Sequence, residues 1–436
     1  MIFRRQNYKI LSIAIPRQGK ALVTEPPYSL ENLVEPQFHA YGNTHRLWSW
    51  MRRNVPIYQH GPSKFPGFWS VTCYKDIRHV YSNPHIYSSA FGVLLRPTKL
   101  GEDPGNGVTL ALTDPPYHKK LRSLIAKWFT MKHALSLESI IREKVKKLLF
   151  NAINKEVCNF THDVTAPLAL YVTCYLLGIP EADQENVFNW THEAFSSGMS
   201  LATHQSFMLY FGKLMHDRMN NPTDDLASCI VHETVDDELL SENEILLNYE
   251  NLLGATENAG LSMASSVLVL LQRPSIWKAL CKQHALLDTG IEELFRWSSS
   301  ATHSMRTVIK PTKLAGYTLE AGERVVVWLA SGNRDESVFE NPNDLNLARS
   351  SNRHLSLGHG EHFCIGNALA RVQMKILLTE LMDMKYSFVL ESEPTPIPSI
   401  YVNGPENLPV RFIYKEPNSK KEAIINEETT EISVYR

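Results

Sequence analysis

A glycine-rich stretch around one cysteine, residues 357–366, constrains this chain more than any other feature. Three glycines flank Cys364, and apolar residues recur at helical spacing directly behind them, so we expect a helix to begin just after the cysteine. The unpaired N–H groups of a first helical turn and the positive end of the helix dipole favour an anion there. Both lower the pKa of a thiol, and we therefore expect Cys364 to be held as a thiolate. The glycines let the backbone approach a flat ligand closely.

A thiolate on such a loop is one way in which proteins hold haem iron, but two other interpretations are open. A single cysteine is more often a small buried hydrophobe. A zinc site is the second alternative, because His354, His359 and His362 lie nearby. Structural zinc normally needs two spaced pairs of ligands, and no second Cys-x-x-Cys or His pair faces this one. Zinc also gives no reason for so many glycines or for the Ala-Leu-Ala-Arg that follows.

The stretch resembles the haem-binding loop of the cytochromes P-450, whose pattern is Phe-Gly-x-Gly-x-His-x-Cys-x-Gly followed by a helix with Leu-Ala-Arg. One position departs, since Leu357 stands where the family has the leading aromatic residue. The resemblance covers residues 40–414. It implies that Cys364 is the proximal iron ligand, with Gly366 beside the cofactor, and that the cofactor is haem b, which is iron protoporphyrin IX.

A second long stretch, residues 241–273, predicts one helix of about 30 residues, roughly 45 Å long. Ser241 and Glu244 have the spacing of a capping box, and Pro274 ends the run. Within it Glu257 falls in register with the apolar residues. Buried carboxylates are rare unless they are paired or functional. We therefore predict a functional carboxylate in the middle of this helix.

Residues 254–258 of that helix are similar to the family's oxygen-binding motif, Ala-Gly-x-Glu/Asp-Thr, with Gly254 and Ala255 in the first two positions. The resemblance implies that Ala255 lies against the haem. It also implies that Glu257 and Asn258 line the distal side, where protons must arrive. Asn258 replaces the usual threonine, and an amide is a poor proton relay. We therefore predict that Glu257 feeds the protons and that Asn258 positions the oxygen.

His118 and Arg122 are four residues apart and share one face of a predicted helix. Such a pair is more often solvated surface. Within the resemblance, the two residues match the family's His-x-x-x-Arg, which binds a haem propionate. Arg306 stands where the family has a second propionate-binding arginine. Together with His362, these residues are expected to bind both propionates.

Glu293 and Arg296 resemble the family's Glu-x-x-Arg, and Arg349 is expected to be the third member of that buried network. Its role would be to hold the cysteine loop in place. Residues 314–319 and 324–329 read as two strands that pair with each other in a hairpin.

Composition limits the class of protein. The chain has 436 residues, is 43% hydrophobic and 21% charged, and carries a formal charge of −2, which is ordinary for a globular enzyme and favours neither nucleic-acid nor membrane binding. Six scattered cysteines indicate reduced thiols. No run reaches the roughly 18–20 apolar residues of a membrane span, and the basic N-terminus lacks a signal-peptide cleavage site. We expect a cytoplasmic protein that is a monomer.

No linker or internal repeat divides the chain, so we expect an irregular segment over 1–36, one catalytic domain over 37–414 and a disordered charged tail over 415–436. The expected fold is mainly α with a small β portion, the cytochrome P-450 fold.

The expected function is a haem-thiolate monooxygenase that acts on a mid-sized organic substrate. The sequence holds no nucleotide-binding fingerprint, so electrons would come from a separate ferredoxin or flavodoxin with its reductase. A peroxide-driven or oxidative-coupling haem-thiolate enzyme and a non-catalytic haem sensor remain open as alternatives.

Overall fold

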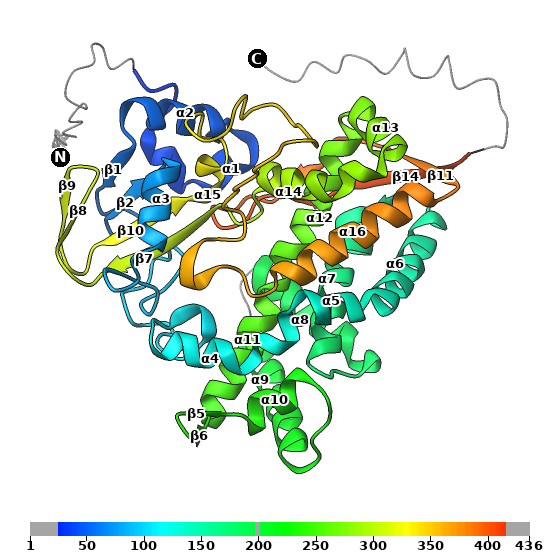
Figure 1. Ribbon diagram of the computed structural model, residues 1–436, viewed down its shortest axis with the longest axis horizontal. Coiled ribbons are helices and arrows are strands. Elements are labelled where there is room, and N and C mark those ends of the chain that lie inside the picture. The colour runs from blue at the N-terminus through cyan, green and yellow to red at the C-terminus, as the bar shows by residue number, and fades with distance from the viewer. Residues whose placement is uncertain (1–24, 197–200, 416–436) are drawn as a thin grey trace, which may run out of the picture.

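The computed structural model describes residues 25–196 and 201–415, which form a large helical part with the largest sheet on one side of it (Figure 1). The helices are α1 (Pro36–Tyr41), α2 (Thr44–Asn54), α3 (Tyr74–Tyr81), α4 (Tyr117–Ile125), α5 (Met131–Ser136), α6 (Glu138–Ile153), α7 (Ala166–Leu176), α8 (Gln184–Ser196), α9 (Leu201–Asn220), α10 (Leu226–His232), α11 (Glu242–Gly254), α12 (Thr256–Leu271), α13 (Pro274–Lys282), α14 (Leu287–Ser298), α15 (Leu329–Gly332) and α16 (Asn367–Asp383). The strands are β1 (Ile57–His60), β2 (Phe68–Val71), β3 (Tyr87–Ser88), β4 (Cys158–Asn159), β5 (Thr234–Val235), β6 (Glu238–Leu239), β7 (His303–Val308), β8 (Thr312–Leu314), β9 (Tyr317–Leu319), β10 (Arg324–Trp328), β11 (Tyr386–Leu390), β12 (Thr395–Pro396), β13 (Pro405–Asn407) and β14 (Pro409–Tyr414).

The largest sheet has five strands in the order β1-β2-β10-β7-β3. Strand β10 lies in its middle, parallel to β2 and antiparallel to β7. Its valines, Val325, Val326 and Val327, are fully buried, which suits a central strand. A three-stranded sheet, β11-β14-β4, and three two-stranded ladders complete the β portion.

The predicted hairpin between residues 314–319 and 324–329 is wrong. Strand β9 pairs instead with β8, through a turn at Ala315 and Gly316, and β10 joins the large sheet. Both turn residues have positive φ, 47° and 93°. Two adjacent residues of this kind make the tight turn that matches the twist of a two-stranded ladder. The turn chemistry therefore placed the hairpin one segment earlier than the strand pattern suggested.

The long central helix is also interrupted. Its capping box is present, with the Ser241 hydroxyl accepting from the Glu244 N–H and the Glu244 carboxylate accepting from the Ser241 N–H. The helix nevertheless divides into α11 and α12 at Ala255. The Thr256 hydroxyl donates to the Leu253 carbonyl over 2.7 Å. A side chain that bonds to the preceding turn in this way commonly bends or breaks a helix.

Helix α12 runs through the centre of the molecule and packs closely on α7 (Figure 1). Gly260 makes this approach possible, because a Cβ there would lie 3.1 Å from the Cα of Ala166. The largest hydrophobic cluster surrounds this pair of helices, and smaller clusters lie on the sheet. The orientation of α12 about its axis is therefore fixed by packing.

The structure describes only part of the two predicted terminal segments. Of the predicted irregular segment 1–36, residues 1–24 lie outside the described residues, and the described part contains a 3₁₀ helix over Leu30–Val34. Of the predicted tail 415–436, residue 415 alone is described. In the part of the chain that the structure describes, no helix is both long and apolar enough to cross a membrane.

Candidate active site

A cavity of about 400 Å³ lies between α12, α4, β7 and the loop before α16. It brings together eight of the nine site residues that the sequence predicts. The eight are His118, Arg122, Ala255, Asn258, Arg306, His362, Cys364 and Gly366. They come from four separate segments of the chain, so their meeting around one cavity is a property of the fold and not of sequence proximity.

The cysteine loop is held in a fixed shape by backbone contacts. The Cys364 N–H donates to the Leu357 carbonyl over 2.8 Å, and the predicted helix begins at Asn367. Gly358 and Gly360 have φ values of +73° and +70°. A Cβ on Gly360 would lie 2.8 Å from the Tyr81 carbonyl oxygen. Both positions therefore require glycine, which explains two of the three glycines in the motif.

The electrostatic environment of Cys364 differs from the sequence expectation. Burial raises the pKa of the thiol above its usual value, although the Gly366 N–H and the charges of Arg122 and Arg371 act in the opposite direction. Desolvation by the surrounding protein therefore outweighs the helix N-terminus at this half-buried cysteine. The predicted lowering of the thiol pKa is therefore wrong for the sulfur by itself. A metal ion bound to the sulfur would take the place of the proton.

Arg306 supplies a buried positive charge to the cavity. The residue is 4% exposed, and its guanidinium donates to the Ser304 hydroxyl and the Met305 carbonyl and lies 4.8 Å from the centre of the Tyr81 ring. No carboxylate within the described ranges forms an ion pair with it. Buried charges are normally paired. This arginine is thus suited to an anionic group that enters the cavity.

His118 and His362 also bring polar atoms without partners to this cavity. Both ring nitrogens of His118 and Nε2 of His362 are buried and have no hydrogen-bond partner among the described residues. The centroids of the two rings lie 4.0 Å apart. Burial, followed by the charge of Arg122, lowers the pKa of His118 to about 4. Burial, followed by the charge of Arg306, lowers the pKa of His362 to about 2. Both histidines are therefore neutral until an anion binds.

The residues present therefore fit a flat cofactor with an iron atom and two carboxylates. Cys364 stands in one wall, and nitrogen-bearing side chains with unused donors stand nearby in the same cavity. Asn258 Oδ1 is likewise buried without a partner in the described part of the chain. The zinc alternative finds no support, since the described residues contain no group of three or more His, Cys, Asp or Glu that could hold a metal.

Comparison with known proteins agrees with this geometry. The family model for cytochrome P-450 matches residues 269–405. A steroid C26-monooxygenase of Mycolicibacterium smegmatis is 30% identical over 404 residues, which cover 88% of this chain and 97% of that protein. The chain belongs to the cytochrome P-450 family. It is accordingly a monooxygenase, an oxidoreductase whose cofactor contains a haem iron.

Other cytochromes P-450 extend the likeness. Cytochrome P-450 NovI of Streptomyces niveus is 29% identical over 400 residues, covering 89% of this chain and 98% of its own. The crystal structure of P-450 OxyD, which is involved in the biosynthesis of vancomycin-type antibiotics, has a TM-score of 0.80 and 29% identity, and it covers 87% of this chain and 98% of its own. The mainly α fold with a small β portion is confirmed.

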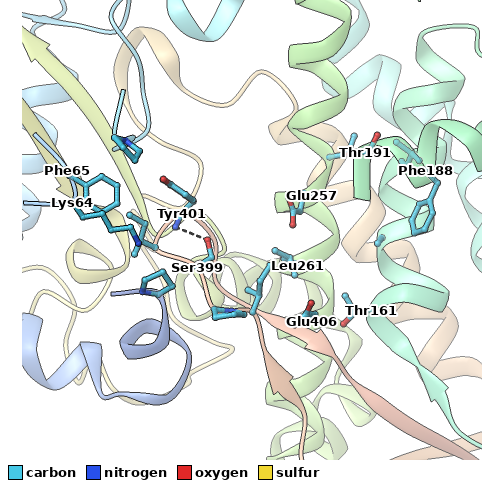
Figure 2. A pocket seen from close by; sticks show the side chains of 18 residues that line it. Lys64, Phe65, Thr161, Phe188, Thr191, Glu257, Leu261, Ser399, Tyr401 and Glu406 are labelled. Carbon is cyan, nitrogen blue, oxygen red and sulfur yellow. Dashed lines mark hydrogen bonds between the residues drawn. The ribbon is translucent and has the colours of Figure 1, made fainter. Parts of the chain in front are cut away.

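Glu257 is the one predicted site residue that does not line the Cys364 cavity. It faces a second cavity of about 390 Å³, with α8 on one side and residues 397–401 on another (Figure 2). Successive residues of a helix point about 100° apart, so Glu257 and Asn258 face different sides of α12. Burial raises the pKa of Glu257 to about 7. Thr256 lines both cavities and marks the wall between them.

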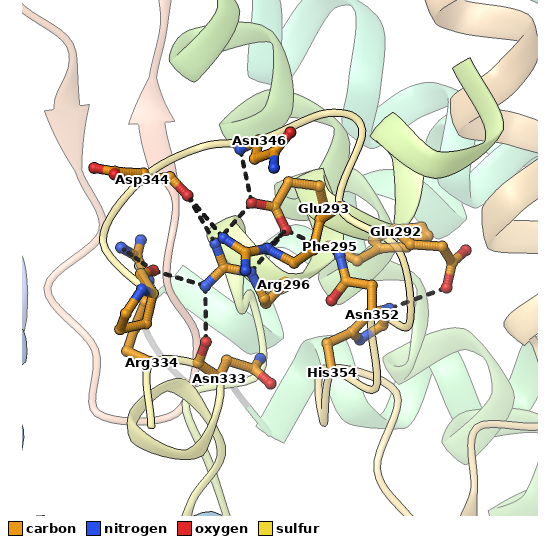
Figure 3. Close-up of polar contacts among 12 residues, drawn as sticks. Glu292, Glu293, Phe295, Arg296, Asn333, Arg334, Asp344, Asn346, Asn352 and His354 are labelled. Carbon is orange, nitrogen blue, oxygen red and sulfur yellow. Dashed lines mark hydrogen bonds and ion pairs between the residues drawn. The ribbon is translucent and has the colours of Figure 1, made fainter. Parts of the chain in front are cut away.

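The predicted network behind the cysteine loop is confirmed (Figure 3). Arg296 donates to both carboxylate oxygens of Glu293 over 2.7 Å, and Arg349 donates to the same carboxylate over 3.0 Å. Neither Glu293 nor Arg296 is exposed. Arg296 also donates to the carbonyls of Asn333 and Pro342. The network therefore fixes the chain segment that leads to the cysteine loop.

A second network, which the sequence interpretation missed, ties α16 to α14. Arg371 donates to the two carboxylate oxygens of Glu292 over 2.6 and 2.9 Å, and His354 Nε2 lies 3.2 Å from the same carboxylate. Burial alone would raise the pKa of Glu292, but the bonds to His354 and Arg371 lower it to about 2. Arg371 is the arginine of the Leu-Ala-Arg motif. The motif pointed to the arginine, but nothing in the sequence pattern indicated that Glu292 is its partner.

Proposed function

We propose that this chain inserts one oxygen atom from O2 into a mid-sized organic substrate, by hydroxylation or epoxidation, and takes electrons from a separate ferredoxin or flavodoxin with its reductase. The observation that carries the proposal is the meeting of eight motif residues around one cavity. The absence of a nucleotide-binding fingerprint in the sequence supports a separate electron donor. A cytoplasmic monomer built from one catalytic domain over residues 37–414 is part of the same proposal.

We propose haem b as the form of the cofactor. Cys364 Sγ would be its iron ligand, while His118, Arg122, Arg306 and His362 would bind its two propionates. Charge-assisted bonds to carboxylates favour arginine and histidine in this role. Ala255 and Gly366 are small, so they would leave room for a flat ligand between them. When bound, the haem iron supplies the activation of O2.

The residues around the cofactor would perform separate tasks. The Gly366 N–H donates to the Cys364 sulfur and stabilises its negative charge. Asn258, with an unused amide oxygen, would orient a water or a substrate group on the distal side. Glu257 would take up a proton in the second cavity and release it from its carboxyl, through water, toward Asn258. Its pKa of about 7 suits a group that must both gain and lose a proton near neutral pH.

A peroxide-driven or oxidative-coupling reaction is the second candidate. The observation that favours it is Asn258, an amide at the position where the family has a hydroxyl. The two candidates differ in the oxidant that they need, so they can be told apart.

The experiment supplies the haem-loaded protein with a panel of terpenoids and steroids in three arms: O2 with a ferredoxin or flavodoxin reductase system, peroxide alone, and neither. We expect product in the first arm and less or none in the others. Equal product with peroxide alone would favour the second candidate. Binding without product in every arm would make the chain a haem sensor.

We predict that Arg306→Leu weakens haem retention by about 10- to 100-fold, because a hydrogen bond between charged groups contributes about 1.5–3 kcal/mol. Transfer of haem to apomyoglobin measures the loss. Arg324→Leu is the matched control, since Arg324 is also a buried arginine, but it lies outside the cavity and donates to the carbonyls of Arg96 and Thr98. Equal retention in the two variants would contradict the propionate assignment.

We predict that Glu257→Gln lowers the product formed per reductant consumed by about 100-fold, the lower end of the 10²–10⁴ that a proton-transfer group typically contributes. Haem content and substrate binding should stay unchanged. In the wild type this coupling should fall between about pH 6 and about pH 8, as the Glu257 carboxyl loses its proton, and in Glu257→Gln it should be flat.

Asn258→Ala provides the comparison, and we expect it to change coupling less than Glu257→Gln does. If coupling survives Glu257→Gln and collapses in Asn258→Ala, the two roles are reversed.

A further inference from the structure

The second cavity is mainly apolar. Phe65, Phe188, Leu261 and Ile400 contribute to its lining, and Figure 2 shows Glu257 and Leu261 projecting from α12 between the side chains of α8 and those of residues 397–401. An apolar chamber with a few polar groups is the usual form of a small-molecule site. The polar groups therefore decide which molecules it accepts.

Five hydroxyl groups line this cavity, and four of them already donate their hydrogen to a main-chain carbonyl. A hydroxyl has one hydrogen, so each of the four can offer an incoming molecule only an acceptor. The bonds are Thr161 to Pro405 (2.9 Å), Thr191 to Val187 (2.7 Å), Thr256 to Leu253 (2.7 Å) and Tyr401 to Leu95 (2.9 Å).

Glu257 adds an acceptor at the same place when its carboxyl is ionised. Its Oε2 atom is buried and has no hydrogen-bond partner within residues 25–196 and 201–415. Glu406 is a further carboxylate in the lining, and its side chain is exposed. Two donors remain: the Ser399 hydroxyl, which accepts from the N–H groups of Tyr401 and Val402, and the exposed amine of Lys64. Acceptors therefore predominate in the buried part.

We infer that the second cavity binds the polar end of the substrate, and that this end is a hydrogen-bond donor, a hydroxyl or an amine, placed on the Glu257 carboxyl. A buried acceptor without a partner disfavours a molecule that brings another acceptor. A carbonyl group in the same position would face Glu257 and four acceptor oxygens. An apolar molecule with a donor at one end satisfies the site.

The position of the cavity links this preference to the reaction, and here the inference rests on the proposed function. Thr256 lines both cavities, so a molecule whose donor lies on Glu257 is one helical residue away from the wall of the Cys364 cavity. A substrate hydroxyl both accepts and donates. It can therefore bind Glu257 without ending proton transfer from this carboxyl.

The test uses three probes with one apolar cage: 1-adamantanol, 1-adamantanamine and 2-adamantanone, which offer a hydroxyl, an ammonium and an acceptor alone. Calorimetric titration of the haem-loaded full chain at about pH 8.5, where the Glu257 carboxyl is ionised, measures their affinities, with no turnover required. We expect the alcohol or the amine to bind about tenfold more tightly than the ketone, the effect of one good hydrogen bond. A visible spectrum identifies any amine that binds the iron directly.

Glu257→Met keeps the length of the side chain and removes the acceptor, so the tenfold preference should fall to about one. Thr191→Val should reduce the preference in the same direction. Leu261→Met is the matched control in this cavity, and it should retain the preference.

Equal binding of alcohol, amine and ketone by the wild type would overturn the inference. So would a preference that survives Glu257→Met or that disappears in Leu261→Met. Because binding is measured without turnover, these outcomes are separate from failure of the proposed monooxygenase reaction.

Discussion

Cys364→Ala should abolish the strongly red-shifted Soret band of the ferrous–CO complex and lower product formation by more than about 100-fold. Loss of a residue that merely supports a metal ligand typically costs 10–100-fold, and loss of the ligand itself should cost more. Cys364 stands in the wall of the same cavity as Arg306 and the two histidines with unpartnered ring nitrogens. The spectrum of the carbon monoxide complex and turnover with the reductase system measure the two effects.

Cys174→Ala is the matched control. Cys174 lies on α7, is fully buried, and has a pKa raised to about 12 by burial, as expected of a small apolar side chain. This variant should keep both the band and the turnover. If Cys364→Ala keeps the thiolate band, the iron ligand is a different residue and the assignment fails.

The sequence predicts the eight residues of the Cys364 cavity because each belongs to a short motif whose geometry is local. Gly360, for example, must be glycine where its backbone has positive φ and passes Tyr81. Such requirements are visible in the residue types themselves. Their meeting in one place follows from the family resemblance, and the structure agrees with it.

The direction of Glu257 could not be predicted in the same way. Its register with apolar residues indicates a side chain that is at least partly buried. The spacing of apolar residues along the helix does not show which of the two cavities Glu257 lines. That depends on the rotation of α12, which the contact of Gly260 with α7 fixes. The break at Ala255 adds to the uncertainty, because it depends on a bond between the Thr256 hydroxyl and the Leu253 carbonyl.

Charge partners far apart in sequence present a similar limit. Glu292 and Glu293 are adjacent, and several arginines follow, so residue types alone do not assign the pairs. In the structure Arg371 pairs with Glu292, whereas Arg296 and Arg349 both pair with Glu293. The neighbouring carboxylates support opposite sides of the loop region because successive helical side chains diverge.

The other large effect is expected on stability. Glu293→Gln should lower the free energy of unfolding by about 3–5 kcal/mol, because removal of one partner of a buried ion pair leaves the other charge uncompensated. Arg296 is fully buried, and Glu293 is its carboxylate partner. Urea unfolding at equal haem content measures the change. Glu138→Gln is the surface control, since Glu138 forms a half-exposed pair with Arg142 that should contribute about 0–1 kcal/mol.

The deficit of Glu293→Gln should also depend on pH in a defined direction. Burial alone would raise the pKa of Glu293, but the bonds from Arg296 and the Asn346 N–H hold it below its usual 4.5. A carboxyl whose pKa is lowered in the folded state stabilises the fold above its unfolded pKa, and this stability is lost as the pH falls through the folded value. The difference between wild type and Glu293→Gln should therefore be constant at neutral pH and shrink below about pH 4.5. A deficit under about 1 kcal/mol at pH 7, or one that grows on acidification, would show that the network does not stabilise the fold through the charge of Glu293.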